Sequence, residues 1–350
     1  MEIQDTIPVR DDEQIDVERV AAFLRGKLPG SEQPLTVRQF GGGAANLTYH
    51  LDYGSHEYVL RRPPLGPVPP SAHDMARESK VLLALWRAYP YAPRAFLFCA
   101  DESIVGAPFF VMERRHGIVV RKQIPAVYAS IPDAPRRMSE ALVDALVDLH
   151  AVDYTAIGLA DLGHPAGFIR RQIEGWQRRW QATELGENPA MRAVHDWLLA
   201  HQPPEDQPSL VHNDYKLDNV MLAADDPGRL VAVFDWDMCT LGDPLSDLGA
   251  LLAYWAQPDD PLHFQALAMM PIQPGFLRRE ELVALYAARS GRDVSHMAFY
   301  HALSLYRVVV IIAQIYVRFV RGQTKDKRFA AFGPVIPAAA QAALDVARGA

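Results

Sequence analysis

The chain has 350 residues, of which 49% are hydrophobic and 22% charged, which is enough apolar material for two lobes that each bury a core. Its formal net charge of −7 gives no basic excess. This charge argues against nucleic acid and against an anionic membrane surface as the main partner, so we expect a small molecule instead. The sequence indicates no oligomeric state.

The beginning of the chain and its cysteines bear on the cell compartment. The segment MEIQDTIPVRDDEQ is polar and acidic and has no apolar signal-peptide core. Cys99 and Cys239 each lie in an apolar stretch, which fits two packed, reduced thiols better than a disulfide framework. We therefore expect a cytoplasmic protein. The most hydrophobic stretch, YRVVVIIAQIYVRFVRG, is interrupted by Arg307 and Arg318 and is predicted to be a buried helix, since a membrane span needs roughly 20 apolar residues.

The first third of the chain predicts a small β-rich lobe. An amphipathic helix is expected over 16–28, because Pro29-Gly30 follows as a stop signal. A second helix, MARESKVLLALWRA, follows the proline-rich loop at 63–70, and Asp74 is its expected N-cap residue. Short β-branched or aromatic runs predict a five-stranded antiparallel sheet from LTVRQF, NLTYHLDY, EYVLRR, RAFLFCA and PFFVMER.

Helical periodicity dominates from Pro135 onward, with one island of short strands between 210 and 235. The expected architecture is therefore a small β-rich lobe followed by a large helical lobe, with the chain crossing between them near 113–117. We predict an α+β protein with two domains, 1–114 and 115–350.

The stretch LVHNDYKLDNVML, followed after the expected turn ADDPGR by LVAVFDWD, carries the clearest chemistry. Asp214 and Asn219 lie between two runs that are predicted to be strands, and Asp235 ends the next run. Transfer of a γ-phosphoryl group needs a carboxylate that accepts the proton of the attacking hydroxyl, and oxygen ligands that hold Mg²⁺ on the nucleotide phosphates. Asp214 suits the first task, and Asn219 and Asp235 suit the second, so ATP and Mg²⁺ are the expected cofactors.

HNDYKLDN followed by FDWD resembles the aminoglycoside phosphotransferase and choline kinase superfamily, whose members are related to protein kinases. The resemblance covers roughly 35–328 and implies a protein-kinase-like two-lobed fold, with nucleotide bound by 1–114 and catalysis and substrate binding in 115–350. It implies that Asp214 is the catalytic base and that Asn219 and Asp235 bind the metal. It further implies that Lys216 touches the transferring phosphate, with a solvated loop lysine as the alternative.

The resemblance also implies that residues of the first lobe bind the nucleotide. Arg61, at the end of EYVLRR, and Glu78, in the following helix, stand where the family has a lysine that contacts phosphates and its glutamate partner. Arginine in place of lysine is a departure from the family pattern, although it keeps the charge and can bind phosphate bidentately. The adjacent Arg62 is an alternative to Arg61, and a simple ion pair between helix and sheet is another reading.

Two further stretches bear on the nucleotide. The run FGGGAANLTYH places Gly41, Gly42 and Gly43 between two expected strands, where backbone N–H groups could approach phosphates. A plain hairpin turn is the alternative. Met112, in PFFVMERRHG, resembles a residue near the adenine pocket where the two lobes join.

Several residues near the catalytic motif have expected supporting roles. His212 is expected to orient the loop through a hydrogen bond rather than to react. Asp237 fits either the metal shell or a turn cap, and both readings stay open. In TLGDPLSDLGALLAYW, Asp243 and Asp247 are expected to brace the catalytic loop and the next helix.

The acceptor is less well defined by the sequence. The segments VHNDYKLDN, RRPP and RFVRGQTKDKRF resemble the branch whose members also occur fused to acyl-CoA dehydrogenases, which implies a small-molecule hydroxyl substrate such as a hydroxyacyl-CoA or a hydroxy acid. Arg178 and Arg179, in WQRRWQ, favour an anionic acceptor unless they form a solvated helix face. The alternatives are an aminoglycoside kinase, a choline or ethanolamine kinase, and a catalytically inactive pseudokinase. Only Arg61 favours the pseudokinase, and the intact set of Asp214, Asn219 and Asp235 opposes it.

Overall fold

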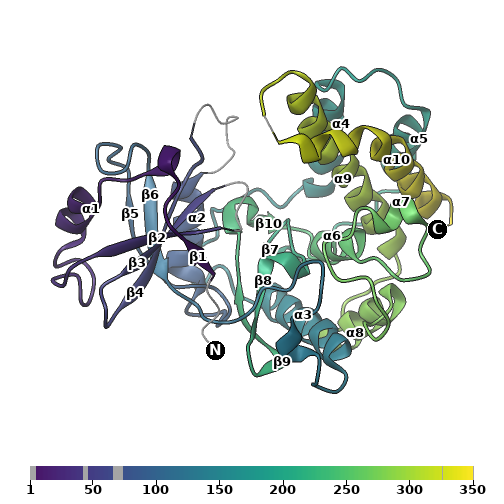
Figure 1. The fold of residues 1–350 in the computed structure, drawn as a ribbon. Coiled ribbons are helices and arrows are strands. Elements are labelled where there is room, and N and C mark those ends of the chain that lie inside the picture. Colours follow the sequence, from purple (N-terminus) through teal and green to yellow (C-terminus); the bar gives the residue numbers. More distant parts are fainter. Residues whose placement is uncertain (1–4, 42–45, 66–73, 325, 350) are drawn as a thin grey trace. The chain divides into compact units, whose positions relative to one another are not determined.

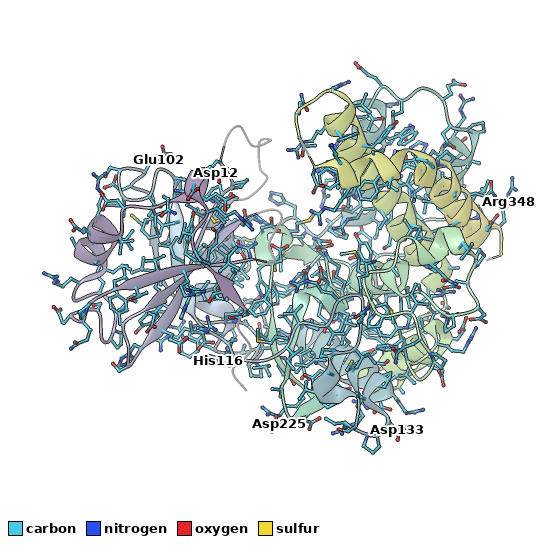
Figure 2. The ribbon with its side chains drawn as sticks, viewed as in Figure 1. Asp12, Glu102, His116, Asp133, Asp225 and Arg348 are labelled. Carbon is cyan, nitrogen blue, oxygen red and sulfur yellow. The ribbon has the colours of Figure 1, made fainter. Side chains whose placement is uncertain are left out.

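The computed structural model describes residues 5–41, 46–65, 74–324 and 326–349, and the chain forms two compact units that interleave along the sequence. The first unit comprises Met1–His116 with two later segments, Ile157–Leu159 and Ala232–Cys239, and the second comprises Gly117–Ala156, Ala160–Val231 and Thr240–Ala350. Figure 2 labels His116, where the chain first leaves the first unit. The functional division into 1–114 and 115–350 stays a prediction, because compactness does not show which unit binds which ligand.

The first unit is built on an antiparallel sheet of six strands rather than the expected five, in the order β1-β2-β3-β4-β6-β5. The five predicted strands correspond to β2 to β6. The additional strand β1 has two residues, which pair with Phe40 and Gln39 of β2, and two residues are too few to show a period. The strands are β1 (Thr6–Ile7), β2 (Thr36–Phe40), β3 (Leu47–Asp52), β4 (Glu57–Arg62), β5 (Ala95–Cys99) and β6 (Phe109–Glu113).

One face of this sheet packs against α1 (Val17–Leu24), as Figure 1 shows. Val20 and Leu24 of the helix are fully buried in a cluster with strand residues such as Tyr49. The helix is shorter than the expected range 16–28: Asp16 is its N-cap, and the chain leaves the helix at Gly26, whose φ of 71° is the left-handed conformation that glycine adopts readily. The stop signal is therefore Gly26, and not Pro29-Gly30.

The opposite face carries α2 (Met75–Leu85). Its N-terminus is fixed as predicted, because the Asp74 side chain accepts a hydrogen bond of 3.0 Å from the N–H of Arg77. Side chains alternate between the two faces of a strand, so the last two residues of β4 point to opposite faces of the sheet. Arg61 lies on the α2 face, while buried Arg62 points to the α1 face, where it contacts the carbonyl of Val105.

The late segment Ala232–Cys239 completes the first unit, with η4 (Trp236–Met238) at its centre. The N–H of Val233 donates to the carbonyl of Tyr91 at 2.8 Å, and the Trp236 ring packs edge-on against Tyr89 at 5.8 Å between centroids. Arg77 of α2 donates to the carbonyl of Cys239 at 2.8 Å. These contacts fix the position of Asp235 relative to α2.

The second unit is mainly helical and carries two pairs of short strands (Figure 1). Its helices are α3 (Ala134–His150), α4 (Phe168–Gln181), α5 (Pro189–Ala200), α6 (Leu245–Tyr254), α7 (Leu262–Gln265), α8 (Arg279–Ser290), α9 (Met297–Val320) and α10 (Phe332–Arg348). The pairs are β7 (Ser209–Val211) with β10 (Thr240–Gly242), and β8 (Val220–Ala223) with β9 (Asp226–Val233). Asp225 lies in the turn of the β8–β9 hairpin (Figure 2). The expected turn ADDPGR is thus too long, since β9 begins at Asp226 and includes Pro227.

The hydrophobic helix α9 lies among α4, α5, α6 and α10, and most of its first four turns are buried. This confirms the prediction of a buried helix. Gly249 of α6 permits a close approach, since a Cβ at that position would lie 2.5 Å from the carbonyl oxygen of Tyr300 on α9. By length and composition alone, α9 and the segment Lys327–Arg348 would pass as membrane spans among the described residues, with 56% and 33% of their most apolar windows buried. The cysteines at 99 and 239 are reduced and buried, as predicted.

Candidate active site

The loop after β7 carries Asp214 and Asn219, the residues that the sequence predicts to be catalytic and metal-binding. Its main chain is held by Asp247 of α6, whose carboxylate accepts hydrogen bonds of 2.6 Å from the N–H groups of His212 and of Asn213. Asp247 is fully buried, and Nε2 of His150 lies 3.4 Å from its Oδ2. Asn213 has a φ of 62°, a left-handed conformation that asparagine tolerates better than most residues. The expected bracing role of Asp247 is therefore confirmed.

Asp214 is held by three neighbours within this loop. Its N–H donates to Nδ1 of His212 at 3.2 Å, so His212 orients the loop as predicted. The side-chain amide of Asn219, at the end of η3 (Leu217–Asn219), donates to the Asp214 carbonyl at 2.9 Å and to its Oδ2 at 3.0 Å. The ammonium group of Lys216 also contacts Oδ2. Asn219 thus uses its amide nitrogen, and not its carbonyl oxygen, toward Asp214.

Arg307 is the residue near Asp214 that the sequence argument did not identify. Its Nη2 lies 3.8 Å from Oδ1 of Asp214, which is too long for a hydrogen bond between these two atoms but close enough for a strong charge interaction. The side chain is only 12% exposed, and its guanidinium lies 5.4 Å from the ring centroid of Trp176 on α4. The available signal was a single cation in the middle of an apolar helix, which has to find a partner.

Tyr254, the last residue of α6, reports on the electrostatics of this loop. Burial raises its pKa, as does the charge of Asp214, while Lys216 and Arg307 act in the opposite direction. The ammonium of Lys216 also lies 5.3 Å from the centre of the Tyr254 ring. Asp214 therefore stands beside two cations and an aromatic ring.

In the first unit, the structure brings Arg61 and Glu78 together. Nε of Arg61 lies 3.0 Å from Oε2 of Glu78, and Nη2 contacts Oδ1 of Asp235. Burial would lower the pKa of Arg61, but the negative charges of Glu78, Asp235 and Asp237 outweigh it, and the pKa rises. Burial, together with the charges of Asp235 and Asp237, raises the pKa of Glu78 to about 7 against the attraction of Arg61. Three carboxylates thus act on the guanidinium of Arg61.

Asp235 adopts φ 70° and ψ 60°, a left-handed conformation that is uncommon for aspartate, directly before η4. Its side chain is 30% exposed, so part of the carboxylate reaches solvent although Arg61 contacts it. Asp237 lies within η4, and its two readings, metal shell or turn cap, stay open. Among the described residues no group of three or more His, Cys, Asp or Glu side chains is arranged to hold a metal ion. A Mg²⁺ site of the kinase type needs only one or two protein oxygen ligands, because the nucleotide phosphates supply others.

The other residues predicted to bind the nucleotide are Gly41, Gly42, Gly43 and Met112. Gly41 follows β2 and is exposed, and a Cβ there would be 3.5 Å from the Ile7 side chain, an ordinary contact. Gly42 and Gly43 lie outside the described residues. Met112 is buried on β6, paired with Val59 and Ala95. The nucleotide roles of these residues stay predictions.

Asp243 lies just before α6, and Arg178 and Arg179 lie on α4. Asp243 accepts hydrogen bonds from the N–H of Leu245 at 3.0 Å and from the hydroxyl of Tyr300 at 2.6 Å, so it ties the start of α6 to α9. Burial raises the pKa of Asp243 despite these bonds. Arg178 and Arg179 are exposed near the end of α4.

Comparison with known proteins places this geometry in a family. Residues 36–299 match the model of the phosphotransferase enzyme family. Acyl-CoA dehydrogenase family member 11 of Rattus norvegicus is 33% identical over 332 residues, covering 93% of this chain and 42% of that protein. Family member 10 of Mus musculus is 31% identical and is covered over 32% of its length. The chain thus spans less than half of these relatives.

Solved structures agree with this assignment. A Ralstonia eutropha protein described as a "putative aminoglycoside phosphotransferase" is 31% identical, with a TM-score of 0.81 and coverage of 96% of this chain and 99% of that one. Aminoglycoside phosphotransferase APH(4)-Ia, in a ternary complex with ADP and hygromycin B, has a TM-score of 0.59 at 17% identity and covers 93% of this chain and 98% of its own. These matches confirm the predicted α+β, protein-kinase-like fold class. The chain belongs to the phosphotransferase enzyme family, among relatives that include the aminoglycoside phosphotransferases.

Proposed function

We propose that this chain transfers the γ-phosphoryl group of ATP to a hydroxyl of a small molecule, with a hydroxyacyl-CoA or a hydroxy acid as the acceptor class. The observation that carries the proposal is the placement of Asp214. Its carboxylate is held by Asn219 and Lys216, on a loop whose main chain is clamped by buried Asp247. This rigid placement is what a general base requires, because its carboxylate has to meet the acceptor hydroxyl in one geometry.

In the proposed reaction Asp214 accepts a hydrogen bond from the acceptor hydroxyl and takes its proton. The hydroxyl oxygen forms a bond to the γ-phosphorus, and the bond from that phosphorus to the β,γ-bridging oxygen breaks, so ADP leaves. Lys216, which contacts Asp214, offsets negative charge on the transferring group. General-base assistance of this kind is typically worth ~10²–10⁴-fold in rate.

We assign the nucleotide to residues of 1–114. Arg61, held by Glu78, supplies a fixed cation for the phosphates in place of the usual lysine. Its fork of N–H donors suits phosphate oxygens. Gly41, Gly42 and Gly43 are proposed to approach the phosphates, and Met112 to contact the adenine.

Asn219 and Asp235 are proposed to hold Mg²⁺. The donor chemistry fits, because Asn219 turns its amide nitrogen and not its carbonyl oxygen toward Asp214, and the side chain of Asp235 is partly exposed. Glu78, Asp235 and Asp237 lie close enough to act electrostatically on one another and on Arg61, and a group of carboxylates of this kind favours a divalent cation. When bound, the ion would supply positive charge that offsets the negative charge of the nucleotide phosphates.

The acceptor class rests on two supports. The relatives named acyl-CoA dehydrogenase family members match this chain over less than half their length, and the resemblance to that branch favours acyl-type acceptors over antibiotics. The two cations beside Asp214, Lys216 and Arg307, disfavour a polycationic aminoglycoside or a quaternary amino alcohol by like-charge repulsion. These compounds remain the alternative acceptors.

A panel assay tests the proposal. ATP consumption is measured with Mg²⁺ and with hydroxyacyl-CoAs, hydroxy acids, aminoglycosides and amino alcohols as acceptors, alongside Mg·ATP binding. We expect nucleotide binding, slow ATP hydrolysis without acceptor, and stimulation by the hydroxyacyl compounds. Stimulation by aminoglycosides alone would replace the acceptor class. Mg·ATP binding with no hydrolysis under any condition would establish the pseudokinase alternative.

A further inference from the structure

Trp176, near the end of α4, is flanked by two arginines from different helices. The guanidinium carbon of Arg179 lies 4.4 Å from the centre of the indole ring, and that of Arg307 on α9 lies 5.4 Å away. Trp176 itself is only 5% exposed. Cation–π attraction at these distances holds both guanidinium groups beside one aromatic ring.

A third arginine converges on the same place. A Cβ built at Gly175 would lie 3.8 Å from Nη1 of Arg179 and 3.9 Å from Nη2 of Arg178, so both guanidinium groups fold over this glycine. Burial lowers the pKa of Arg179, and the charges of Arg307 and Arg178 lower it further. The three side chains therefore act on one another as like charges.

The cluster differs from an ordinary charged helix surface. One turn or more earlier on α4, Arg170 pairs with Glu174 at 2.9 Å in the usual exposed i,i+4 arrangement. Arg178 and Arg179, by contrast, form no salt bridge with any carboxylate in the part of the chain that the structure describes. Packing thus gathers three guanidinium groups, and two of them, those of Arg178 and Arg179, have no carboxylate partner in the described part of the chain. A group of positive charges of this kind is suited to bind an oxyanion.

The helix face that carries Arg307 continues as a half-buried apolar stripe. Ile311 and Ile315 follow at one and two turns from Arg307, and both side chains are incompletely buried. Gln314 lies between them and is also half-buried. An aliphatic carbon chain would find apolar contact along this stripe, next to the guanidinium.

From these contacts we propose that Arg307 and Arg179, supported by Arg178, bind a carboxylate of the acceptor, so that the second unit selects short hydroxy acids. The inference rests on the proposed function, since it takes Asp214 as the group that meets the acceptor hydroxyl. It narrows the acceptor from hydroxyacyl compounds in general to those with an anionic group close to the reacting oxygen. Arg307 and Arg179 are specificity-determining residues in this scheme.

The distance between the two ends of the site sets the length of the acceptor. A general base works at about 3 Å from the hydroxyl it deprotonates, and Nη2 of Arg307 lies 3.8 Å from Oδ1 of Asp214. A carboxylate on Arg307 is therefore only a few atoms from the hydroxyl. The phosphates of a coenzyme A thioester lie much further along their molecule and do not meet this condition.

Calorimetric binding to the full chain tests the site without any phosphoryl transfer. The probes are γ-hydroxybutanoate, its neutral amide γ-hydroxybutanamide, and the corresponding coenzyme A thioester. We expect the acid to bind and the amide to bind at least about tenfold more weakly, since a charge-assisted hydrogen bond is worth at least that factor. Arg307→Gln and Arg179→Gln should each weaken binding of the acid by about tenfold or more and leave the amide unchanged.

Matched controls separate recognition from structure. Arg170→Gln on α4 and Arg318→Gln on α9 remove exposed arginines outside the cluster and should leave the affinity for the acid unchanged. Arg307→Lys, which keeps the charge but loses the fork, should retain part of the affinity. In turnover assays Arg179→Gln should raise KM for the acid more than it lowers kcat. If Arg307→Gln does not fold, the exposed Arg179 still provides the test.

Equal affinity for acid and amide would overturn the inference, as would binding of the acid that neither Arg307→Gln nor Arg179→Gln weakens. Binding of the thioester but not of the free acid would also overturn it.

Failure of the proposed function would give different results. If the acid binds through these arginines but ATP is never consumed, the phosphotransferase assignment fails and the carboxylate site stands. If ATP is consumed only with acceptors that lack a carboxylate, the carboxylate site fails and the phosphotransferase assignment stands.

Discussion

Arg61 and Glu78 form an ion pair of 3.0 Å between β4 and α2, and the alternation of β4 directs Arg62 to the other face of the sheet. The same guanidinium contacts Asp235. The neighbouring arginines therefore have separate roles: Arg61 is in a carboxylate cluster, and Arg62 is in the core under α1.

We expect Arg61→Met to weaken Mg·ATP binding by about tenfold or more, because it removes a charge-assisted contact to phosphate. Arg61→Lys should keep part of the affinity. The measurement is the Kd for Mg·ATP. Arg62→Met is the matched control: it should lower the melting temperature, since Arg62 is 4% exposed and contacts a buried carbonyl, and leave the Kd of the folded protein unchanged. The reverse pattern would transfer the phosphate role to Arg62.

Asp235→Asn tests the metal assignment. Asparagine tolerates the left-handed conformation seen at φ 70°, so the main chain is expected to hold while the anionic ligand is lost. Nucleotide binding should lose its dependence on Mg²⁺, measured as the ratio of Kd values with and without the ion. Asp237→Asn provides the comparison. A larger loss of metal dependence in Asp237→Asn than in Asp235→Asn would reverse the two roles.

Asp214→Asn keeps the shape of the side chain and removes the base. Turnover should fall by ~10²–10⁴-fold, equivalent to roughly 3–5 kcal/mol in the activation barrier, with little change in ATP affinity. Single-turnover kinetics with the best acceptor from the panel would measure this. Turnover within about threefold of the parent, or ~0.7 kcal/mol, would exclude a base role. A collapse of ATP affinity would place Asp214 in the metal shell.

Asp247→Ala should disturb the catalytic loop from a distance. The substitution leaves the N–H groups of His212 and Asn213 without their acceptor, and each buried unsatisfied donor costs about 1–3 kcal/mol. We expect a lower melting temperature and a lower kcat, with the Kd for Mg·ATP largely kept. Asp247→Asn retains one acceptor oxygen and should show a smaller loss of both. An unchanged kcat in folded Asp247→Ala would show that the hydrogen bonds from His212 and Asn213 to Asp247 are not needed for catalysis.

His301 on α9 predicts how stability depends on pH. Burial lowers its pKa to about 3, with help from Arg279 and against the attraction of Asp260. The unfolded chain binds a proton near the ordinary pKa of 6.5 while the folded chain does not. Stability should therefore be fully present above pH 6.5 and fall as the pH drops from there toward 3, by up to about 1.4 kcal/mol per pH unit.

Urea denaturation of His301→Gln at several pH values would measure this slope. The variant should show a flatter dependence than the parent between pH 6 and 5, whereas His164→Gln, at an exposed position, should keep the slope of the parent. An equal slope in parent and His301→Gln would show that other groups control acid sensitivity.

Much of the fold could be predicted because its periodicities are strong. The five longer strands and α2 follow from alternating and helical patterns, and the N-cap at Asp74 follows from side-chain chemistry. Strand β1 could not be predicted, because its two residues are set by pairing with β2 and not by a local pattern. Helix α1 ends earlier than predicted, because the left-handed conformation at Gly26 ends it before the chain reaches Pro29-Gly30.

The residues of the candidate site likewise differ in whether the sequence could predict them. The spacing of Asp214 and Asn219 sufficed to predict that they share a loop, and strand alternation would have distinguished Arg61 from Arg62. Arg307 could not be identified from its neighbours in sequence, since it reaches Asp214 from a helix that begins 83 residues later. Contacts of this kind depend on how helices pack, which a local pattern does not specify.

The placement of Ala232–Cys239 within the first unit affects how the protein is made. A ribosome has to synthesise 239 of the 350 residues before the small unit has all its parts. Until then Tyr89 and Tyr91 lack the contacts that Trp236 and Val233 give them. The amino-terminal part of the chain therefore cannot finish folding first, as domains commonly do during synthesis, and has to await a segment that follows about half of the larger unit.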